Sequence, residues 1–259
     1  MSELAPERVR GLLRGGFGSP YRWERECPST QDLVLGRGLP EGAVAATDHQ
    51  TAGRGRSGRS WADEPGASLL VSVLLRPPAA AVTPQLSLVA GLAAAEAVES
   101  ATGLPAALKW PNDVVLGGRK VAGVLLEASA DEVACGIGVN VARAPAAAAA
   151  GALPATSLAA ETGARHDRAE LLAALLETLE QRYRDWREGG LERVLPELAR
   201  RHFLHGRAVV VDAGAGRAGA IAPDGRLEVE LDAGGRRLVE SGEVVLSPAP
   251  ARAGSRSGP

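Results

Sequence analysis

Residues 53–61, GRGRSGRSW, place three arginines among three glycines before a tryptophan. Glycine lets the backbone bend and approach a ligand closely, while Arg54, Arg56 and Arg59 supply fixed positive charge. Such a loop becomes ordered when an anion neutralises it, and its closure then keeps water away from a reactive group. We therefore expect a mobile loop that closes on an anion. A flexible basic loop that contacts RNA phosphates is the plainer alternative, because the same composition suits it.

The scarcity of lysine and asparagine is a second chemical signal. The chain has 27 arginines but only two lysines, Lys109 and Lys120, and only two asparagines, Asn112 and Asn140. Lysine is a compact charge that can follow a phosphate oxygen, and asparagine offers the donor and acceptor together that a purine edge requires. Three of these four residues lie within twelve positions. We interpret this concentration as a site in which arginine or aspartate could not substitute.

Most of these residues belong to the stretch LKWPNDVVLGGRKVAGVLLE, residues 108–127. Pro111 fixes a bend after Trp110 and so presents Asn112 and Asp113 at the edge of a strand. An amide and a carboxylate placed there can hold a divalent cation on a triphosphate. The simpler interpretations are that Asp113 is a turn residue that caps a strand and that Trp110 is an aromatic residue of the core.

The second half of this stretch predicts a β-hairpin that returns a lysine to the same place. Gly117 and Gly118 separate two short apolar runs and suit a hairpin turn. Lys120 then lies on the return strand, near the cation site and within reach of a phosphate or carboxylate oxygen. Gly123 lies in the interior of that strand, which indicates that a flat group lies against its backbone.

The elements that position these residues follow from hydrophobic periodicity. Apolar runs bounded by Gly and Pro predict strands, and apolar residues repeated every three or four positions predict helices. Strands are expected at residues 42–50, 67–78, 106–110, 113–116, 120–130 and 131–143. Helices are expected at residues 6–14, from a cap at Ser29 or Thr30 to an end near residues 36–38, and at 83–102, 167–188 and 191–202. The first two strands flank the arginine loop and so fix both of its ends.

A change of composition after residue 204 divides the chain. Residues 1–204 carry the stretches described above and are predicted to form the main domain, with a low-complexity connection at 145–155. Residues 205–248 contain about four or five short strands joined by Pro-Asp-Gly and Ala-Gly-Gly turns, which is typical of a small β-barrel. Residues 249–259 are predicted to be a disordered tail.

Composition also limits the classes of function. The formal net charge is −2, so no general attraction to nucleic acid or to a membrane surface is expected and phosphate binding must be local. Cys27 and Cys135 lack a CxxC or histidine-rich spacing, which argues against a disulfide framework and a structural zinc site and favours small buried side chains. No signal peptide or membrane span is recognisable, so a cytoplasmic protein is expected.

Four motifs in this sequence resemble those of the biotin-protein ligases, which activate biotin with ATP and transfer it to a lysine of a carrier domain. The family's GRGRxGR loop corresponds to residues 53–59, KWPND to 109–113, K-x-AG-[IV]-L-x-E to part of 118–127, and GIGVNV to 136–141. Their order and spacing agree across residues 25–142. The resemblance implies an α+β fold in which an SH2-like, mixed-sheet catalytic domain of the biotin/lipoate ligase type precedes an SH3-like β-barrel.

The resemblance also implies a set of biotin-binding residues. In the family, the Ser-Thr pair and the glutamine bind the biotin head group, whose ureido ring needs both donors and acceptors. This chain has Gln31 where the family commonly has asparagine, which is one methylene shorter. The implied biotin-binding residues are Ser29, Thr30, Gln31, Gln50, Arg54, Gly55, Arg56, Lys120 and Gly123.

A second implied set binds ATP and carries the reaction. Lys120 would bind the carboxylate and later the α-phosphate, so that it stabilises charge on the pentavalent transition state. Asp113 with Asn112 would hold Mg²⁺, and Asn140 would read the adenine edge. Positioning and electrostatics then supply the catalysis without a covalent enzyme nucleophile. The implied catalytic residues are Lys120, Arg56 and Asp113, and the implied ATP-binding residues are Arg54, Arg56, Trp61, Asn112, Lys120 and Asn140.

The implied reaction converts biotin and ATP into biotinyl-5′-AMP and transfers biotin to a lysine of a biotin carboxyl carrier protein domain. Some members of the family carry an N-terminal winged helix-turn-helix, but about 24 residues precede the catalytic region here, so we expect the ligase-only type without sequence-specific DNA binding. Monomer and homodimer both remain open. The alternatives are a lipoate-protein ligase or octanoyl transferase of similar fold, and an RNA-binding module with steep salt dependence.

Overall fold

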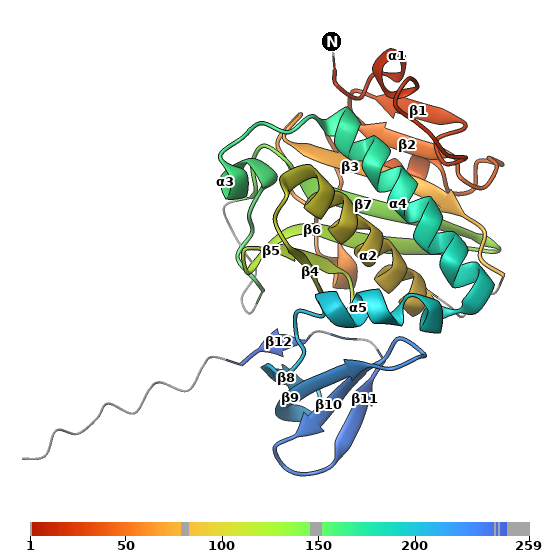
Figure 1. Cartoon of the computed structure of the whole chain (residues 1–259). Helices are drawn as coiled ribbons and strands as arrows, with labels where there is room; N and C mark the ends of the chain where they lie inside the picture. The colour runs from red at the N-terminus through yellow and green to blue at the C-terminus, as the bar shows by residue number, and fades with distance from the viewer. Residues whose placement is uncertain (1, 79–82, 146–151, 241, 243, 248–259) are drawn as a thin grey trace, which may run out of the picture.

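A seven-stranded mixed sheet and a five-stranded antiparallel sheet form the framework of the protein (Figure 1). The computed structural model describes residues 2–78, 83–145, 152–240, 242 and 244–247. The larger sheet contains β1 (Tyr21–Glu24), β2 (Val44–Thr47), β3 (Ser68–Leu75), β4 (Ala106–Lys109), β5 (Asp113–Leu116), β6 (Arg119–Ser129) and β7 (Glu132–Asn140). Their order is β1-β2-β3-β7-β6-β5-β4, with β1 and β2 parallel and the other neighbouring pairs antiparallel. The predicted α+β class is therefore confirmed.

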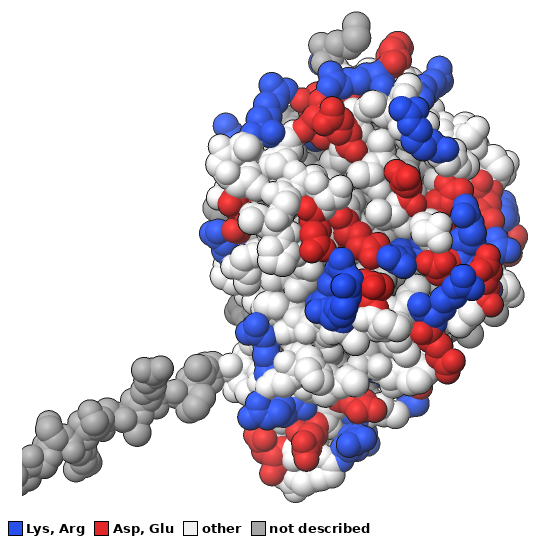
Figure 2. Space-filling model, in the orientation of Figure 1, with Lys and Arg blue, Asp and Glu red and all other residues white. Residues whose placement is uncertain are grey.

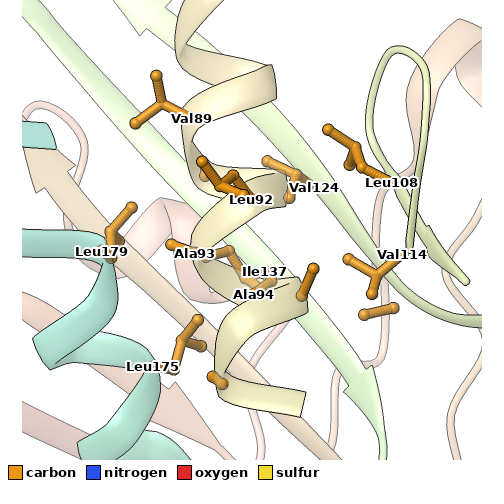
Figure 3. Close-up of a cluster of buried hydrophobic side chains, with 14 of the residues drawn as sticks. Val89, Leu92, Ala93, Ala94, Leu108, Val114, Val124, Ile137, Leu175 and Leu179 are labelled. Atoms are coloured by element: carbon orange, nitrogen blue, oxygen red, sulfur yellow. The ribbon is translucent and has the colours of Figure 1, made fainter. Parts of the chain in front are cut away.

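Two long helices cover one face of the larger sheet. α2 (Thr83–Thr102) and α4 (Arg168–Gly189) run side by side across it in Figure 1. Side chains from both helices and from the sheet converge in the core shown in Figure 3, where Leu92, Leu175 and Ile137 are each at most 2% exposed. Because one face of the sheet is committed to this core, alternate residues of each strand are left to face the loops on the other side.

Strand β7 illustrates how this alternation prepares a site. Ile137 and Val139 point into the core beneath the helices. Gly136 and Gly138 lie between them in sequence and face the other side of the sheet, where they meet Gln31 and the Trp61 ring. Because these glycines have no side chains, other groups approach the backbone of the strand closely there.

The second sheet follows the short helix α5 (Leu195–Arg201), which lies between the two sheets in Figure 1. It has the order β11-β10-β9-β8-β12. A buried hydrogen bond of 2.9 Å from Trp110 Nε1 to the Gly225 carbonyl joins it to the larger sheet. Trp110 is 1% exposed, so its simpler interpretation as a core aromatic is confirmed. The strands are β8 (Ala208–Val211), β9 (Gly214–Ile221), β10 (Leu227–Leu231), β11 (Arg236–Val239) and β12 (Val245–Leu246).

Two expected helices are shorter than predicted. The helix expected at 6–14 is confined to α1 (Pro6–Val9), because the glycine-rich sequence that follows does not sustain an α-helix. The helix expected after Ser29 is the 3₁₀ turn η1 (Thr30–Leu33), in which the Ser29 hydroxyl accepts from the Gln31 N–H as a cap. Thr30 and Gln31 bury their side chains instead of exposing one face of a helix.

Other elements were not predicted or lie outside the structure. Strand β1 and helix α3 (Leu158–Thr162) were not expected from sequence. The predicted helix at 191–202 divides into a 3₁₀ turn, η4 (Leu191–Arg193), and α5. The predicted disordered tail, residues 249–259, lies outside the described residues, as does most of the low-complexity connection.

Basic and acidic side chains alternate over the face that carries α2 and α4 (Figure 2). Arg182 of α4, for example, pairs with Glu96 of α2 at 2.8 Å and with Asp185 at 3.3 Å. The mixture agrees with the formal net charge of −2. Within the described ranges, no helix has both the length and the apolar character needed to cross a bilayer.

Candidate active site

A cavity of about 340 Å³ lies against the loop-bearing face of the larger sheet. Its walls come from η1, the arginine loop, the turn between β4 and β5, and strands β6 and β7. Every residue that the sequence assigned to biotin, ATP or metal lines it: Ser29, Thr30, Gln31, Gln50, Arg54, Gly55, Arg56, Trp61, Asn112, Asp113, Lys120, Gly123 and Asn140. The motifs therefore converge on one site, although they are spread over more than a hundred positions of the chain.

One wall of the cavity is a preorganised chain of polar groups. The Gln50 side-chain oxygen accepts from the Thr30 N–H at 2.8 Å and from the Thr30 hydroxyl at 3.2 Å. The Thr30 hydroxyl also lies 2.7 Å from the Ser72 hydroxyl on β3. Thr30 and Ser72 are at most 3% exposed, so these bonds form away from water and hold the side chains in fixed orientations.

Gln31 is held against the sheet by its side-chain amide. Its Nε2 donates to the carbonyl oxygens of Leu125 at 3.2 Å and Ala134 at 3.3 Å. A Cβ atom at Gly136 would lie only 3.1 Å from the Gln31 Cδ, so a side chain there would crowd the amide. The Gln31 side chain, one methylene longer than the asparagine common in the family, thus reaches the backbone of β6 and β7. Gln31 also lines the cavity.

The flat group expected against Gly123 is the indole of Trp61. A Cβ atom at Gly123 would lie 3.1 Å from this ring, and one at Gly138 would lie 2.6 Å from it. The Trp61 Nε1 is buried and has no hydrogen-bond partner among the residues that the structure describes, and the Lys120 ammonium lies 5.8 Å from the ring centroid. The end of the arginine loop therefore packs on glycines of β6 and β7.

The predicted hairpin is confirmed and pairs a lysine with an aspartate. Strands β5 and β6 are antiparallel, with Asp113 opposite Gly123 and a register shift beside Val115. The Lys120 Nζ lies 2.6 Å from the Asp113 Oδ1, and their side chains are 29% and 20% exposed. This ion pair faces the cavity, where an anionic ligand would compete with Asp113 for the ammonium.

Asn112 connects the arginine loop to β6. Its Oδ1 accepts from the Arg56 Nη1 at 3.1 Å, and its Nδ2 donates to the Val124 carbonyl at 2.8 Å. The Val124 N–H in turn donates to the Asn112 carbonyl at 3.0 Å. Arg56 is thereby directed toward the turn that precedes Asp113.

These contacts bear on the expected Mg²⁺ site. Among the residues that the structure describes, no cluster of three or more His, Cys, Asp or Glu side chains suits a metal ion. Mg²⁺ on a nucleotide typically takes one or two protein carboxylates and completes its shell with phosphate oxygens and water. Asp113 fits as one such carboxylate, whereas the Asn112 side-chain oxygen is already bonded to Arg56.

Asn140 brings a buried side-chain amide to the cavity wall. It is 2% exposed, and its Nδ2 donates to the Thr156 carbonyl at 3.0 Å. Its Oδ1 is buried without a hydrogen bond in the described structure. An unpaired buried acceptor costs about 1–3 kcal/mol, so a ligand donor in the cavity would remove that cost.

Neither cysteine has the properties of a nucleophile. Burial raises the pKa of the Cys135 thiol to about 12 and also raises the pKa of the Cys27 thiol. Both are free and buried, as expected from sequence. Thiolate chemistry near neutral pH is therefore disfavoured at both positions.

Several residues of the site were not singled out from sequence. Asp32 and Glu127 both accept hydrogen bonds from the Arg54 guanidinium. Both could have been noticed, because Asp32 directly follows Gln31 and Glu127 is the last residue of the stretch 108–127. Ser72 had no signal, because it lies inside an apolar strand. Gly242 and Val244, which precede β12, also line the cavity, and only the fold brings them there.

Comparison with known proteins gives consistent results for the family and the fold. The model of the Biotin/lipoate A/B protein ligase family matches residues 25–141. The chain is 39% identical over 204 residues to a bifunctional ligase/repressor of Bacillus subtilis, which covers 73% of this chain. It thus spans 61% of the length of that relative.

Two further matches extend over most of both chains. The chain is 39% identical over 215 residues to a biotin–[acetyl-CoA-carboxylase] ligase of Mycobacterium tuberculosis, with 79% of each protein covered. The solved structure of the Aquifex aeolicus biotin protein ligase in complex with biotin and ATP matches with a TM-score of 0.78 and 31% identity. That match covers 88% of this chain and 99% of the Aquifex chain.

Proposed function

Because the chain belongs to the biotin protein ligases of the biotin/lipoate A/B protein ligase family, we propose that it activates biotin with ATP and transfers it to a lysine of a biotin carboxyl carrier protein domain. We further propose that it acts in the cytoplasm. One observation carries this proposal. A single cavity contains the Lys120–Asp113 ion pair, the fixed polar chain of Thr30 and Gln50, and the unpaired Asn140 oxygen.

In the first proposed step, a carboxylate oxygen of biotin attacks the α-phosphorus of ATP. A new P–O bond forms as the bond to pyrophosphate breaks, giving biotinyl-5′-AMP. Lys120 holds the carboxylate and then the α-phosphate, and Arg56 adds positive charge beside it, so both stabilise the charge that develops in the transition state. The polar groups of Thr30 and Gln50, which Ser72 helps to hold in place through Thr30, orient the ureido ring, so that reaction follows from positioning.

In the second proposed step, the neutral amine of the carrier lysine attacks the carbonyl carbon of the adenylate. An amide bond forms, the bond from the acyl carbon to the phosphate oxygen breaks, and AMP leaves while the amine loses a proton. The arginine loop, with Trp61 at its end, covers the cavity and limits the access of water, which would hydrolyse the mixed anhydride. No side chain of the enzyme needs to form a covalent bond.

Nucleotide binding in this proposal depends on Asn140 and Asp113. The unpaired Asn140 oxygen accepts a hydrogen bond from the adenine amino group, which satisfies the buried acceptor. Asp113 would hold Mg²⁺ that arrives with ATP, and bound Mg²⁺ neutralises negative charge on the triphosphate. Asn112 then acts through its bond to Arg56.

The test is a transfer assay with purified protein, radiolabelled biotin, ATP and a biotin carrier domain. Labelling of the carrier is expected only when all three additions are present. A parallel set with lipoate or octanoate in place of biotin separates biotin ligation from the related acyl transfers. Label transfer with lipoate but not biotin would reject the proposed substrate, and binding to RNA without any pyrophosphate release would reject the enzymatic function.

A further inference from the structure

The Arg54 guanidinium is occupied by two carboxylates of the protein itself. Its Nε and Nη2 donate to the two oxygens of Glu127, both at 2.7 Å. Its Nη2 and Nη1 donate to the two oxygens of Asp32, at 2.8 Å and 3.2 Å. An arginine side chain has about five N–H donors in all. These four bonds therefore leave little donor capacity for a ligand.

The charge around Arg54 also disfavours contact with an anion. One guanidinium between the carboxylates of Asp32 and Glu127 gives the group a formal charge of −1. The hydrogen bonds that Arg54 donates to Asp32, and then those to Glu127, raise the pKa of Arg54, so it remains charged. A carboxylate or phosphate that approached this group would meet two like charges at close range.

Arg54 lies at the base of a small hairpin formed by the arginine loop. Arg54 and Ser60 form an antiparallel bridge, and the Trp61 N–H donates to the Gly53 carbonyl at 2.9 Å. The Gly55 N–H donates to the Arg59 carbonyl at 2.7 Å. Because of these bonds we call residues 53–61, the arginine loop described above, the arginine hairpin. Its base is fixed by these backbone bonds, and Arg56 and Trp61 extend from it into the cavity walls.

The two partners of Arg54 belong to elements that form different walls of the cavity. Asp32 lies on η1, directly after Gln31, and Glu127 lies on β6, on the same strand as Lys120. The side chain of Arg54 thus joins the hairpin base to both elements at once. Two bidentate contacts restrain a guanidinium in orientation as well as in distance.

We propose that Arg54 is a positioning residue, whose bonds to Asp32 and Glu127 latch the arginine hairpin in place and so hold Arg56 and Trp61 over the cavity. In this role the Arg54 side chain does not contact biotin or ATP, in contrast to the expectation from sequence. Its effect on catalysis rests on the proposed function. The latch itself does not depend on that function.

The ligand-free protein provides the first test. Asp32→Asn and Glu127→Gln each remove one charge from the latch without changing any arginine, so the sites at which trypsin can cut remain the same. Each variant is expected to be cleaved within the hairpin about 10-fold faster than the wild type, because local opening becomes more frequent. Glu64→Gln is the matched control, since it weakens the exposed Arg143–Glu64 pair outside the hairpin and also leaves every arginine in place. Cleavage of both latch variants at the wild-type rate would overturn the latch.

The second test measures whether Glu127→Gln raises or lowers the KM for biotin in biotin-dependent pyrophosphate exchange. When the latch is weakened, a smaller fraction of the protein has the hairpin in place, so the KM for biotin is expected to rise about 10-fold with kcat almost unchanged. Direct binding of a ligand by Arg54 predicts the opposite, because release from Glu127 would free donors and leave the KM equal or lower. An equal or lower KM would therefore overturn the positioning role, even if cleavage became faster.

Arg54→Lys distinguishes geometry from charge. Lysine keeps the positive charge but cannot form two bidentate contacts, so this variant is expected to behave like Glu127→Gln in both assays. Retention of the wild-type KM would contradict the latch. Thermal melting by circular dichroism checks that each variant is folded. Absence of exchange in the wild type would reject the proposed function, and tryptic cleavage would still decide whether the latch exists.

Discussion

Lys120 and Arg54 both line the cavity, but their donors are used very differently. Lys120 has about three donors and, among the described residues, a single carboxylate partner, Asp113, at 2.6 Å. Arg54 makes four bonds to Asp32 and Glu127. Lys120 therefore keeps the capacity to bind a ligand oxygen, whereas Arg54 is already committed to the protein.

Replacement of Lys120 tests this difference at the chemical step. Lys120→Ala is expected to lower the rate of biotin-dependent pyrophosphate exchange by about 10²–10³-fold, since it removes a charge that stabilises the transition state. The fold should be unaffected, because the ion pair is partly exposed. Arg119→Ala is the control, as its side chain pairs with Glu161 and is outside the cavity lining. Equal rates for Lys120→Ala and the control would remove Lys120 from the mechanism.

Replacement of Asn140 tests the assignment of the adenine contact. Asn140→Ala removes the unpaired acceptor, so the KM for ATP is expected to rise about 10-fold through loss of a buried hydrogen bond to the ligand. The KM for biotin should change little, and discrimination of ATP against GTP should decrease. Steady-state exchange kinetics with both nucleotides measure these effects. If the KM for biotin rose and the KM for ATP did not, Asn140 would belong to the biotin-binding part of the cavity.

At the scale of elements, helices and strands with a strong hydrophobic periodicity could be predicted from the sequence, whereas those with a weak periodicity could not. Helix α2 occupies residues 83–102 as expected, and β4, β5 and β7 lie within the predicted ranges. Strand β1 escaped prediction because in its four residues, YRWE, only Tyr21 is buried. The hairpin of β5 and β6 was predictable from its glycine turn, and this turn brings Lys120 to Asp113.

The contacts of the site were less predictable than its residues. Motif spacing identified Arg54 and Trp61, but nothing in the spacing shows that Arg54 meets Asp32 and Glu127, which are 22 and 73 positions away. Likewise, the indole against Gly123 was expected only as an unspecified flat group. Such contacts depend on strand order and register, which the sequence does not state residue by residue.

The packing of the arginine hairpin on β7 can be tested through Gly138. In Gly138→Ala the new methyl would lie 2.6 Å from the Trp61 ring, so the indole must move. We expect altered tryptophan fluorescence, a KM for biotin raised about 10-fold, and a stability loss of about 1–3 kcal/mol from overpacking. Gly11→Ala is a suitable control, because the nearest heavy atom to its Cβ would be 4.0 Å away. An unshifted emission spectrum would show that the indole is not held on this strand.

At the scale of the whole molecule, the second sheet contributes to both stability and the cavity. The Trp110–Gly225 bond attaches it to the larger sheet, and Gly242 and Val244 bring its last segment to the cavity wall. The connection between the two sheets passes through His202 at the end of α5. Any change that loosens this connection should therefore affect the site as well as the fold.

His202 makes this connection sensitive to acid. Its Nε2 is buried without a hydrogen-bond partner in the described part of the chain, and the next residue, Phe203, donates its N–H to the Leu108 carbonyl at 2.9 Å. Burial, with a smaller effect of His205, lowers the pKa of His202 to about 4. The unfolded chain binds this proton near an ordinary pKa of about 6.5, and therefore binds more protons than the folded chain between the two values.

Stability is consequently expected to be complete above about pH 6.5 and to fall as the pH approaches 4, because protonation favours the unfolded chain in that window. The loss attributable to His202 should be about 1–3 kcal/mol, or several degrees in Tm. Thermal melts from pH 7.5 to 4 measure it, with His202→Gln expected to have a smaller decline and His205→Gln to follow the wild type. The same decline in His202→Gln would assign the acid sensitivity to other groups. Because the histidine lies at the joint between the sheets, exchange activity should be lost together with the melting transition.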